Sequence, residues 1–362
     1  MKKTDFYDIH VGLGAKMVDY AGYTMPIQFK NGIIHEHKVV REKVGIFDVS
    51  HMGEFKIVGP QALDVIQKIT INDAAKLSKW DAQYSAMCYE DGGIVDDLLI
   101  YNMGQDGYLL VVNGANIEKD WNWVLENSKG FDAELMNQSE EIHLLAVQGP
   151  KALDTLANLT KIDMSVIPFY KFREGMLLDE YMLVSRTGYT GELGFELYFR
   201  NNKGTAERIY NAIMEAGEKY GIEPIGLGAR DTLRLEKGFP LYGNDIDQTT
   251  NPIEAGLGWI TKVNKGDFIG REKIIEIMES KPTRRLVGFT VDTDKFIARH
   301  GYTVFADGKE IGQVTSGNQS PSLGIPIGMA YVQTEYKNPG TKIEIERKGK
   351  FYPATIKKMP LL

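Results

Sequence analysis

The sequence predicts an α+β fold in which a duplicated core is followed by a β-rich C-terminal domain. Two observations carry this prediction. The six-residue pattern GPQALD at residues 59–64 recurs as GPKALD at residues 149–154, and elements of the same kind follow both copies in the same order. After residue 262, helical spacing largely gives way to short alternating runs that are typical of strands. A chain of 362 residues has room for two or three domains at roughly 150 residues each.

Each copy of the pattern predicts a strand, a helix, two further strands and a second helix. An apolar stretch precedes each copy, and the proline of each copy suits the first turn of a helix because its φ is already fixed. This order is most of a ferredoxin-like unit, so two copies indicate a duplicated core; the alternative is that the echo arose by chance. The elements that we expect next are strands over residues 93–101, 108–112, 182–186 and 195–199 and helices over residues 118–126 and 205–220.

The C-terminal third predicts a small barrel or sandwich. A helix is expected over residues 267–280. Asp307-Gly308 and residues 348–350 lie between strand-like runs, where they favour hairpin turns. The runs with stated bounds cover residues 286–291, 311–315, 328–332, 341–347 and 351–356.

Composition excludes several classes of protein. The net charge of −7 argues against a nucleic-acid binder, which needs a dense basic surface. No window approaches 18 uncharged apolar residues, so we expect no membrane span. The single cysteine, Cys88, rules out an internal disulfide and indicates a reducing compartment, and its apolar neighbours favour an inert buried thiol over a reactive one. No presequence is recognisable after Met1, so a cytoplasmic location is expected.

Common cofactor and metal motifs are missing from the sequence. It contains no G-x-G-x-x-G after a strand, no G-x-x-x-x-G-K-[ST] and no G-x-S-x-G elbow. His35 and His37 flank Glu36 at a spacing of two, and on a helix such positions diverge. We interpret this triplet as a solvated helix face and not as a metal site.

The first candidate for chemistry is the segment at residues 91–100. A turn there starts an apolar strand that carries the adjacent carboxylates Asp96 and Asp97. On a strand the two side chains point to opposite faces, so one of them can face a pocket as an acid, base or hydrogen-bond acceptor. The alternative is that both are edge or cap residues.

The second candidate is the segment at residues 186–196. Gly188, Gly191 and Gly194 allow close backbone approach and unusual φ angles. Tyr189 offers a stacking surface, and the carboxylate of Glu196 matches the paired N–H donors of a guanidine-like heterocycle edge. A plain hairpin connection is the alternative.

The third candidate is a helix over residues 226–236, where Arg230 and Arg234 share a face. They suit a clamp for a carboxylate or carbonyl group, although for Arg234 a surface ion pair is favoured. The loop over residues 238–243 then supplies Tyr242.

The fourth candidate is the segment at residues 47–54. His51 is either a general base or a packed core histidine, and packing is favoured because no partner stands at a fixed spacing. Met52 either lines a ring pocket or belongs to the core.

These four segments together resemble the family of the T protein of the glycine cleavage system, the aminomethyltransferases. The resemblance covers essentially the whole chain, and each motif is moderately specific while their conjunction is strong. Further segments that carry it are Phe6-Tyr7, Tyr20-Ala21-Gly22-Tyr23, Met25-Pro26 and Lys358-Met359-Pro360.

The resemblance implies a fold of two ferredoxin-like folate-binding domains plus a C-terminal β-barrel domain. The implied divisions are residues 1–50 with 140–270 for the first folate-binding domain, residues 51–139 for the second ferredoxin-like domain and residues 282–362 for the barrel. This agrees with the echo and with the β-rich C-terminal third.

The resemblance also implies an activity in bacterial glycine catabolism. An aminomethyl group on the dihydrolipoyl arm of the H protein would transfer its carbon to tetrahydrofolate, giving 5,10-methylenetetrahydrofolate, ammonia and dihydrolipoyl H protein. Tetrahydrofolate would be a co-substrate, and no metal, flavin or pyridoxal phosphate is expected in this chain.

The resemblance implies roles for individual residues. Asp96 would be catalytic, hydrogen-bonding the folate amine and orienting it towards the aminomethyl carbon. Glu196 would hold the pterin donors and Arg230 the polar or anionic groups of the ligand. The remaining folate-binding candidates are Met52, Tyr84, Asn113, Tyr189 and Tyr242.

Two other functions remain alternatives, a non-catalytic folate-binding or assembly module and a folate-dependent demethylase subunit. Related demethylating enzymes usually carry a flavin domain, for which this chain has no dinucleotide fingerprint. Related iron–sulfur assembly factors carry a Lys-Gly-Cys-Tyr type of motif, whereas residues 236–240 here read EKGFP, without a cysteine.

Overall fold

The computed structural model describes residues 1–202, 204–293 and 296–362. The chain forms two compact units. Unit 1 comprises Met1–Ile66, Ala74–Tyr84 and Leu98–Asp231, and unit 2 comprises Gln67–Asp73, Ser85–Asp97 and Thr232–Leu362.

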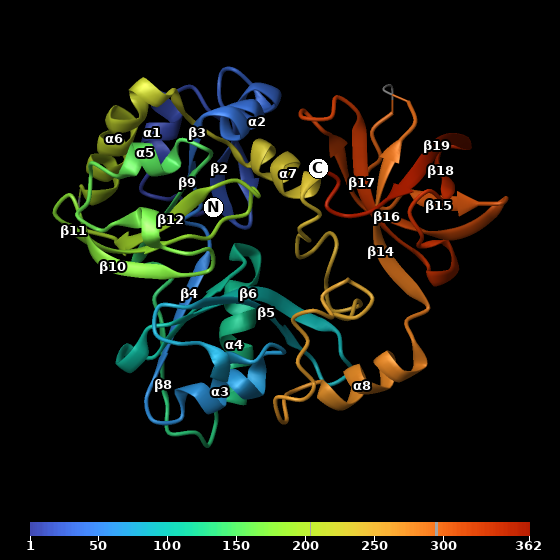
Figure 1. Cartoon of the computed structure of the whole chain (residues 1–362), viewed down its shortest axis with the longest axis horizontal. Helices are drawn as coiled ribbons and strands as arrows, with labels where there is room; N and C mark the ends of the chain where they lie inside the picture. The colour runs from blue at the N-terminus through green and yellow to red at the C-terminus, as the bar shows by residue number, and fades with distance from the viewer. Residues whose placement is uncertain (203, 294–295) are drawn as a thin grey trace. The chain divides into compact units, whose positions relative to one another are not determined.

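A six-stranded sheet has the order β10-β11-β12-β9-β3-β13. Its neighbours pair antiparallel except β13 and β3, which are parallel. Apolar side chains from one face of the sheet pack with α5 and α6 into a buried core, and Figure 1 shows both helices on that side. The bounds are β3 Val44–Asp48, β9 Ile142–Gln148, α5 Ala152–Leu156, β10 Phe172–Leu177, β11 Glu180–Ser185, β12 Gly194–Arg200, α6 Thr205–Gly217 and β13 Ile222–Pro224.

A five-stranded sheet has the order β5-β6-β7-β4-β8. The helix α4 packs on one of its faces, where the ring of Trp121 lies 5.1 Å from that of Phe55 on β4. The bounds are β4 Gly53–Val58, α3 Ala62–Ile69, β5 Ala82–Cys88, β6 Ile94–Asn102, β7 Tyr108–Val112, α4 Ile117–Asn127 and β8 Glu134–Asn137.

The predicted duplication is confirmed at the level of topology. The series β4-α3-β5-β6-β7-α4-β8 repeats as β9-α5-β10-β11-β12-α6-β13, and in both sheets the strands adjoin in corresponding order. The order β8-β4-β7-β6 is that of a ferredoxin-like sheet. The second copy differs in one respect: β3, from the N-terminal segment, takes the place beside β9, and β13 pairs with β3 instead.

The backbone explains why both copies of the repeated pattern begin with glycine. Gly59 and Gly149 adopt φ angles of 114° and 130°, which L side chains rarely tolerate. A Cβ on Gly149 would lie 2.5 Å from the carbonyl oxygen of Lys43, and one on Gly59 would lie 2.9 Å from that of Asp132. The helices begin at Ala62 and Ala152, two residues beyond each proline and slightly later than predicted.

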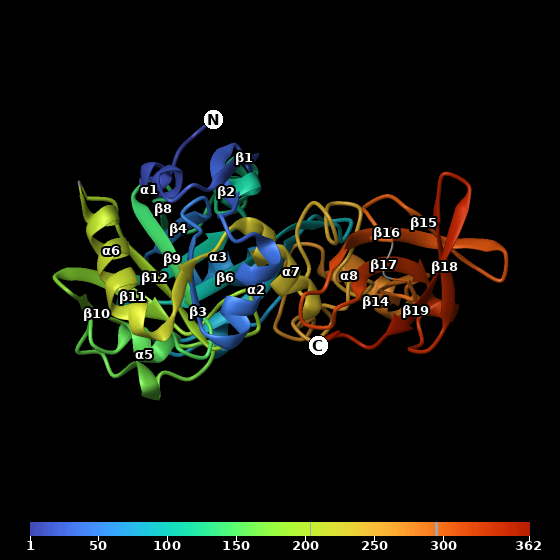
Figure 2. The ribbon, with the colours of Figure 1, turned by 90° about the horizontal axis from the view of Figure 1, so that it is seen from above.

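The C-terminal strands form a closed barrel, which decides between the two architectures that the sequence leaves open (Figure 2). Its order is β14-β17-β16-β15-β18-β19. Both predicted hairpins are present: Asp307 and Gly308 have φ angles of 50° and 73°, and Lys348 and Gly349 have 52° and 76°. The bounds are β14 Arg284–Val291, β15 Thr303–Ala306, β16 Lys309–Gln319, β17 Pro326–Gln333, β18 Lys342–Arg347 and β19 Lys350–Lys357.

The remaining elements connect these layers. The helix predicted over residues 267–280 begins only at Arg271, because Gly270 before it has a left-handed φ of 84°. No helix in the described part of the chain is long and apolar enough to cross a membrane. The bounds are α1 Tyr7–Gly12, β1 Lys16–Tyr20, β2 Tyr23–Gln28, α2 Ile33–Glu42, α7 Leu227–Glu236 and α8 Arg271–Ser280, with short 3-10 turns at Ala74–Lys76, Gly104–Asp106, Gly114–Asn116, Met164–Val166, Glu218–Tyr220 and Thr334–Tyr336.

Candidate functional site

Each of the two sheets has one face that packs on α4 or on α5 and α6, and an opposite face without these helices. On the six-stranded sheet, α2 reaches that opposite face beside β3, where a Cβ on Gly45 would lie 2.8 Å from the Val40 side chain. On β12, Phe195, Leu197 and Phe199 belong to the core shared with α5 and α6, so Glu196 and Tyr198 point to the opposite face. On β4, Phe55 contacts α4, so Glu54 points away from that helix. We call these opposite surfaces the helix-free faces.

A buried cluster of hydroxyl groups joins the two helix-free faces within unit 1. The Tyr101 hydroxyl, from β6, lies 3.0 Å from the Tyr198 hydroxyl on β12 and 3.2 Å from Oγ1 of Thr187. Burial raises the pKa of both phenols, so they stay uncharged. The cluster therefore presents neutral hydrogen-bonding groups in a setting shielded from water.

Glu196 is held by this cluster. The Thr187 hydroxyl donates a hydrogen bond to the Glu196 carboxylate. Burial raises the pKa of Glu196, and the Thr187 hydrogen bond, the positive charge of Arg230 and a hydrogen bond with Tyr198 act in the opposite direction. A carboxylate fixed in this way can accept hydrogen bonds from a ligand without first giving up a water shell.

The glycine-rich loop before β12 is shaped around one side chain. A Cβ on Gly194 would lie 2.6 Å from Gln148 atoms, and one on Gly188 would collide with the same side chain. The Gln148 amide donates to the carbonyl of Thr187 at 3.1 Å and accepts from the Thr190 hydroxyl at 2.8 Å. The glycines thus allow the close approach that the sequence predicts.

Arg230 on α7 and Tyr189 in this loop form a stacked pair. The guanidinium carbon lies 4.4 Å from the centre of the Tyr189 ring, within the range of a cation–π contact. Both side chains are half-buried. The pair therefore offers an aromatic face and a cation beside the strand that carries Glu196.

His51 is a buried neutral histidine, as the packing interpretation expects. It is 2% exposed, and its ring meets that of Tyr20 edge-on at 5.3 Å. Burial, with the charge of Arg230 as a second cause, lowers the pKa of His51 to about 3. Met52, the next residue, is half-buried in the connection between β3 and β4.

Three other predicted residues, Met52, Tyr84 and Asn113, lie in or next to strands of the five-stranded sheet. The register pairs Gly53 with Val112, so Met52 directly precedes and Asn113 directly follows a paired residue of β4 and β7. Tyr84 is half-buried on β5. In unit 2, the Tyr242 hydroxyl donates to the carbonyl of Ile94, the first residue of β6, at 3.2 Å.

The two adjacent aspartates of β6 differ in exposure. Asp96 is fully buried, whereas Asp97 is half-buried. Alternation along β6 places Asp97 with Leu99 and Tyr101 on one face and Asp96 with Leu98 and Ile100 on the other. Asp97 therefore shares its face of the strand with a member of the hydroxyl cluster.

Two interpretations of charged residues are wrong. Arg234 is not in a surface ion pair: it is 1% exposed, and its guanidinium donates to the Asp245 carboxylate at 2.6 Å and to the Ser316 hydroxyl at 2.9 Å. The segment at residues 35–37 is not a solvated face, because Glu36 and His37 are 1% and 0% exposed. The Glu36 carboxylate accepts hydrogen bonds from the backbone N–H groups of Phe29 and Gly226. Among the described residues, no group of three His, Cys, Asp or Glu side chains could hold a metal ion.

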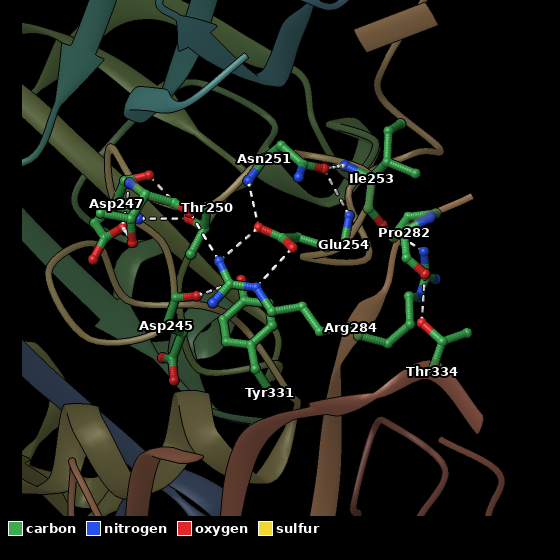
Figure 3. Close-up of polar contacts among 12 residues, drawn as sticks. Asp245, Asp247, Thr250, Asn251, Ile253, Glu254, Pro282, Arg284, Tyr331 and Thr334 are labelled. Carbon is green, nitrogen blue, oxygen red and sulfur yellow. Dashed lines mark hydrogen bonds and ion pairs between the residues drawn. The ribbon is translucent and has the colours of Figure 1, made fainter. Parts of the chain in front are cut away.

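A separate groove lies in unit 2 and contains none of the predicted site residues. Its volume is about 880 Å³. Figure 3 shows its main ion pair, in which Arg284 donates to both oxygens of Glu254 at 2.8 and 3.0 Å and stacks 4.8 Å from the Tyr331 ring. The guanidinium is thus already paired within the protein. The lining residues are Thr283, Arg284, Glu310, Ile311, Gly312, Gln313, Tyr331, Gln333, Thr334 and Glu335.

The sequence interpretation missed the three hydroxyl residues of the cluster, Tyr101, Thr187 and Tyr198, and the buried Glu54 on β4. Three of them stand two or four positions from residues that the sequence did single out: Glu54 follows Met52, Tyr198 follows Glu196, and Tyr101 follows Asp97. Extending the period of two along each candidate strand would have placed them on the same faces.

Family models and curated relatives that match this chain all point to the same family. The family model described as the GCVT N-terminal domain matches residues 6–265, and that described as the glycine cleavage T-protein C-terminal barrel domain matches residues 284–362. The aminomethyltransferase of Bacteroides thetaiotaomicron is 54% identical over 364 residues and 99% of both chains, and that of Halothermothrix orenii is 48% identical over 362 residues and the full length of both.

A solved structure agrees with these relatives. The crystal structure of glycine cleavage system aminomethyltransferase T from Bartonella henselae superposes with a TM-score of 0.93 at 33% identity, covering 100% of this chain and 98% of that one. Because family models and full-length relatives agree over nearly every residue, the chain belongs to the glycine cleavage T-protein family, the aminomethyltransferases.

Proposed function

We propose that this chain is a tetrahydrofolate-dependent aminomethyltransferase. It transfers the methylene carbon of an aminomethyl group, carried on the dihydrolipoyl arm of H protein, to tetrahydrofolate. The products are 5,10-methylenetetrahydrofolate, ammonia and dihydrolipoyl H protein. Tetrahydrofolate supplies the nucleophilic amines that take up the carbon, and the chain's own residues bind and orient them.

The single observation that carries this proposal is the arrangement around Glu196 in a chain of this family. A carboxylate fixed by Thr187 stands beside a stacked tyrosine and arginine. Such a carboxylate matches the adjacent N–H donors of a pterin ring, and an aromatic face matches the ring's plane. The residues present therefore fit the group that the family uses.

We assign the other predicted folate-binding residues to the same site. Arg230 provides a cation for polar or anionic groups of the ligand. Met52 and Asn113 adjoin the paired residues Gly53 and Val112, just outside β4 and β7, and we propose that they border the ring. Tyr84 and Tyr189, both in unit 1, supply further aromatic surface. For Tyr242, in unit 2, the folate-binding role is proposed from the family resemblance alone. The proposal includes the predicted domain boundaries: residues 1–50 with 140–270 form the first folate-binding domain, residues 51–139 the second ferredoxin-like domain and residues 282–362 the barrel.

The orienting carboxylate comes from the pair on β6. The sequence predicts Asp96 in this role. Asp96 is fully buried and lies on the same face of β6 as Leu98 and Ile100, which does not suit contact with a ligand. Asp97 is half-buried and shares a face with Tyr101, so it is the better candidate for this role. We therefore propose that Asp97 positions the folate amine and that Asp96 stabilises the strand. Positioning of reacting groups contributes several kcal/mol to catalysis.

The partner and compartment follow from the proposed reaction. The chain would act on lipoylated H protein in the bacterial cytoplasm, without a metal, flavin or pyridoxal phosphate of its own.

The experiment is product formation from aminomethylated H protein, with and without tetrahydrofolate. We expect methylenetetrahydrofolate and ammonia in equal amounts when folate is present. If the chain binds tetrahydrofolate but forms no product, the transferase is refuted and the binding-module alternative stands. If it converts methylated amines only together with a flavoprotein, the demethylase alternative stands.

A further inference from the structure

The buried carboxyl group of Glu54 has no role in the site described so far. Its side chain is 0% exposed on β4. Neither of its carboxyl oxygens has a hydrogen-bond partner among the residues that the structure describes. A buried polar group without a partner costs about 1–3 kcal/mol, so native proteins seldom keep one without a use.

The backbone around Glu54 is fully engaged, so the strand itself is not irregular there. Its N–H donates to the Ser139 hydroxyl at 3.0 Å, and its carbonyl accepts from the N–H of Gln138 at 2.8 Å. The unsatisfied atoms are confined to the carboxyl end of the side chain.

The strand register directs that end towards the hydroxyl cluster. Glu54 pairs with Val111 on β7, and Val111 pairs with Leu99 on β6. These three residues form a row on the helix-free face, two positions along β6 from Tyr101. Burial is the main cause that raises the pKa of Tyr198, and an ionised Glu54 would be the weakest of several further causes. Glu54 therefore lies near the same tyrosine pair that adjoins Glu196.

Burial decides the protonation state of Glu54. It raises the pKa of this carboxyl well above its usual range, and no cation or hydrogen-bond donor among the described residues counteracts it. Burial thus favours the protonated form, a carboxylic acid with one O–H donor and one carbonyl acceptor side by side. Burial also raises the pKa of Glu196, but there a hydrogen bond from Thr187 and the charge of Arg230 oppose the rise.

We propose that Glu54 is a binding residue for the ligand's uncharged heterocycle, donating a hydrogen bond to a ring carbonyl while Glu196 accepts from ring N–H groups. This inference rests on the proposed function. A neutral carboxylic acid matches a lactam edge, which offers an acceptor and a donor side by side. Surroundings that keep a carboxyl uncharged do not suit the anionic glutamate tail of a folate, so the contact is with the ring.

Two variants of Glu54 and one control test this assignment. Glu54→Met keeps the length of the side chain and removes both polar atoms. Glu54→Gln keeps a donor and an acceptor. Glu36→Met is the control, because Glu36 is equally buried but its carboxylate already accepts from the N–H groups of Phe29 and Gly226 at 2.6 and 2.7 Å. The measurements are the melting temperature of the free protein and two dissociation constants. One Kd is for tetrahydrofolate, and the other is for p-aminobenzoylglutamate, which lacks the pterin ring.

If Glu54 binds the ring, its removal has opposite effects on stability and on binding. Glu54→Met raises the melting temperature of the free protein, because an unpaired buried polar group is removed, while it weakens tetrahydrofolate binding by about tenfold or more. Glu54→Gln binds within about threefold of the wild type, since the amide preserves the hydrogen bonds. The Kd for p-aminobenzoylglutamate does not change in either variant. Glu36→Met lowers the melting temperature.

The results that overturn the inference are distinct from those that overturn the proposed function. If Glu54→Met melts higher but binds tetrahydrofolate as the wild type does, the ligand does not use the carboxyl. If it melts lower, water or another group already satisfies the carboxyl in the free protein, and the inference fails. If the wild type itself does not bind tetrahydrofolate, the proposed function fails instead.

Discussion

At the scale of single residues, burial of ionisable groups is the feature that organises this molecule. Arg234 and Asp245 form a buried ion pair at 2.6 Å, Glu36 caps two backbone N–H groups, and His51 is buried without its charge. Each of these groups has a different reason to be inside the protein. Their energetic effects therefore differ in sign and in pH dependence.

Replacing Arg234 by Met is expected to destabilise unit 2. The substitution leaves the buried Asp245 carboxylate without its cation, which costs about 3–5 kcal/mol. The measurement is the free energy of unfolding in urea. As a control, Lys237→Met, at a less buried position close by, should cost less than about 0.5 kcal/mol. A similar small loss for both variants would contradict the ion pair's assigned role.

His51 makes stability depend on pH in the acid range. Its pKa is about 3 in the folded protein, against an ordinary value of 6.5. Between these values the unfolded chain binds a proton that the folded chain does not, so stability falls as pH falls, by about 1.4 kcal/mol per pH unit. The contribution of His51 to the pH dependence fades over about one pH unit above this ordinary value.

The His51→Gln variant lacks this titration. We expect the difference in unfolding free energy between wild type and variant to shift by about 2–3 kcal/mol between about pH 6 and pH 4, in favour of the variant at the lower pH. Chemical denaturation at a series of pH values measures it. Parallel curves for the two proteins would show that His51 is protonated equally in both states.

At the scale of elements, the repeated Gly-Pro turns set how each ferredoxin-like unit begins its first helix. The φ of 130° at Gly149 and the nearby carbonyl oxygens of Lys43 and Val40 leave no room for a Cβ. The turn therefore depends on glycine for two independent reasons, conformation and space.

Gly149→Ala is expected to destabilise the protein by roughly 3 kcal/mol, because it adds steric contact to backbone strain. Gly14→Ala is a matched control, since Gly14 has a φ of 74° but a Cβ added there would meet no atom within 4 Å. The control should lose only about 1–2 kcal/mol. Equal losses in thermal or urea unfolding would mean that the close approach to Lys43 and Val40 is not important.

Local sequence patterns predicted most elements because they depend on neighbouring residues. The strand predicted at residues 108–112 is β7 without change, and Asp307-Gly308 forms its hairpin because both residues tolerate positive φ. The insertion of β3 beside β9 could not be predicted, since strand order depends on contacts between residues about 100 positions apart. Helical periodicity likewise places Arg230 and Arg234 on one face of a helix, but it does not show that Arg234 is buried.

At the scale of the whole molecule, a duplication supplied two sheets with the same layering. Each sheet packs helices on one face, and within unit 1 the other faces are joined through Tyr101, Thr187 and Tyr198. The sequence identified Glu196, Tyr189 and Arg230 of this site through their loop and helix. It did not identify Glu54, because nothing local shows that an acidic residue on a strand is buried.

The fold class and family that the sequence predicts are confirmed by the closed barrel, the paired ferredoxin-like sheets and the full-length relatives. The domain boundaries and the individual ligand contacts stay predictions. We place the chemistry on the helix-free face of β6, and the two adjacent aspartates of that strand are therefore the sharpest test of this central claim.

The measurement is single-turnover formation of methylenetetrahydrofolate by Asp97→Asn and Asp96→Asn, together with the Kd for tetrahydrofolate. We expect Asp97→Asn to lower the rate by about a hundredfold or more while the Kd changes less than about tenfold, because orientation is lost and most of the binding surface is kept. Asp96→Asn should retain the rate within a few-fold and lose stability. If Asp96→Asn abolishes turnover and Asp97→Asn does not, the reacting face of the strand has been assigned incorrectly.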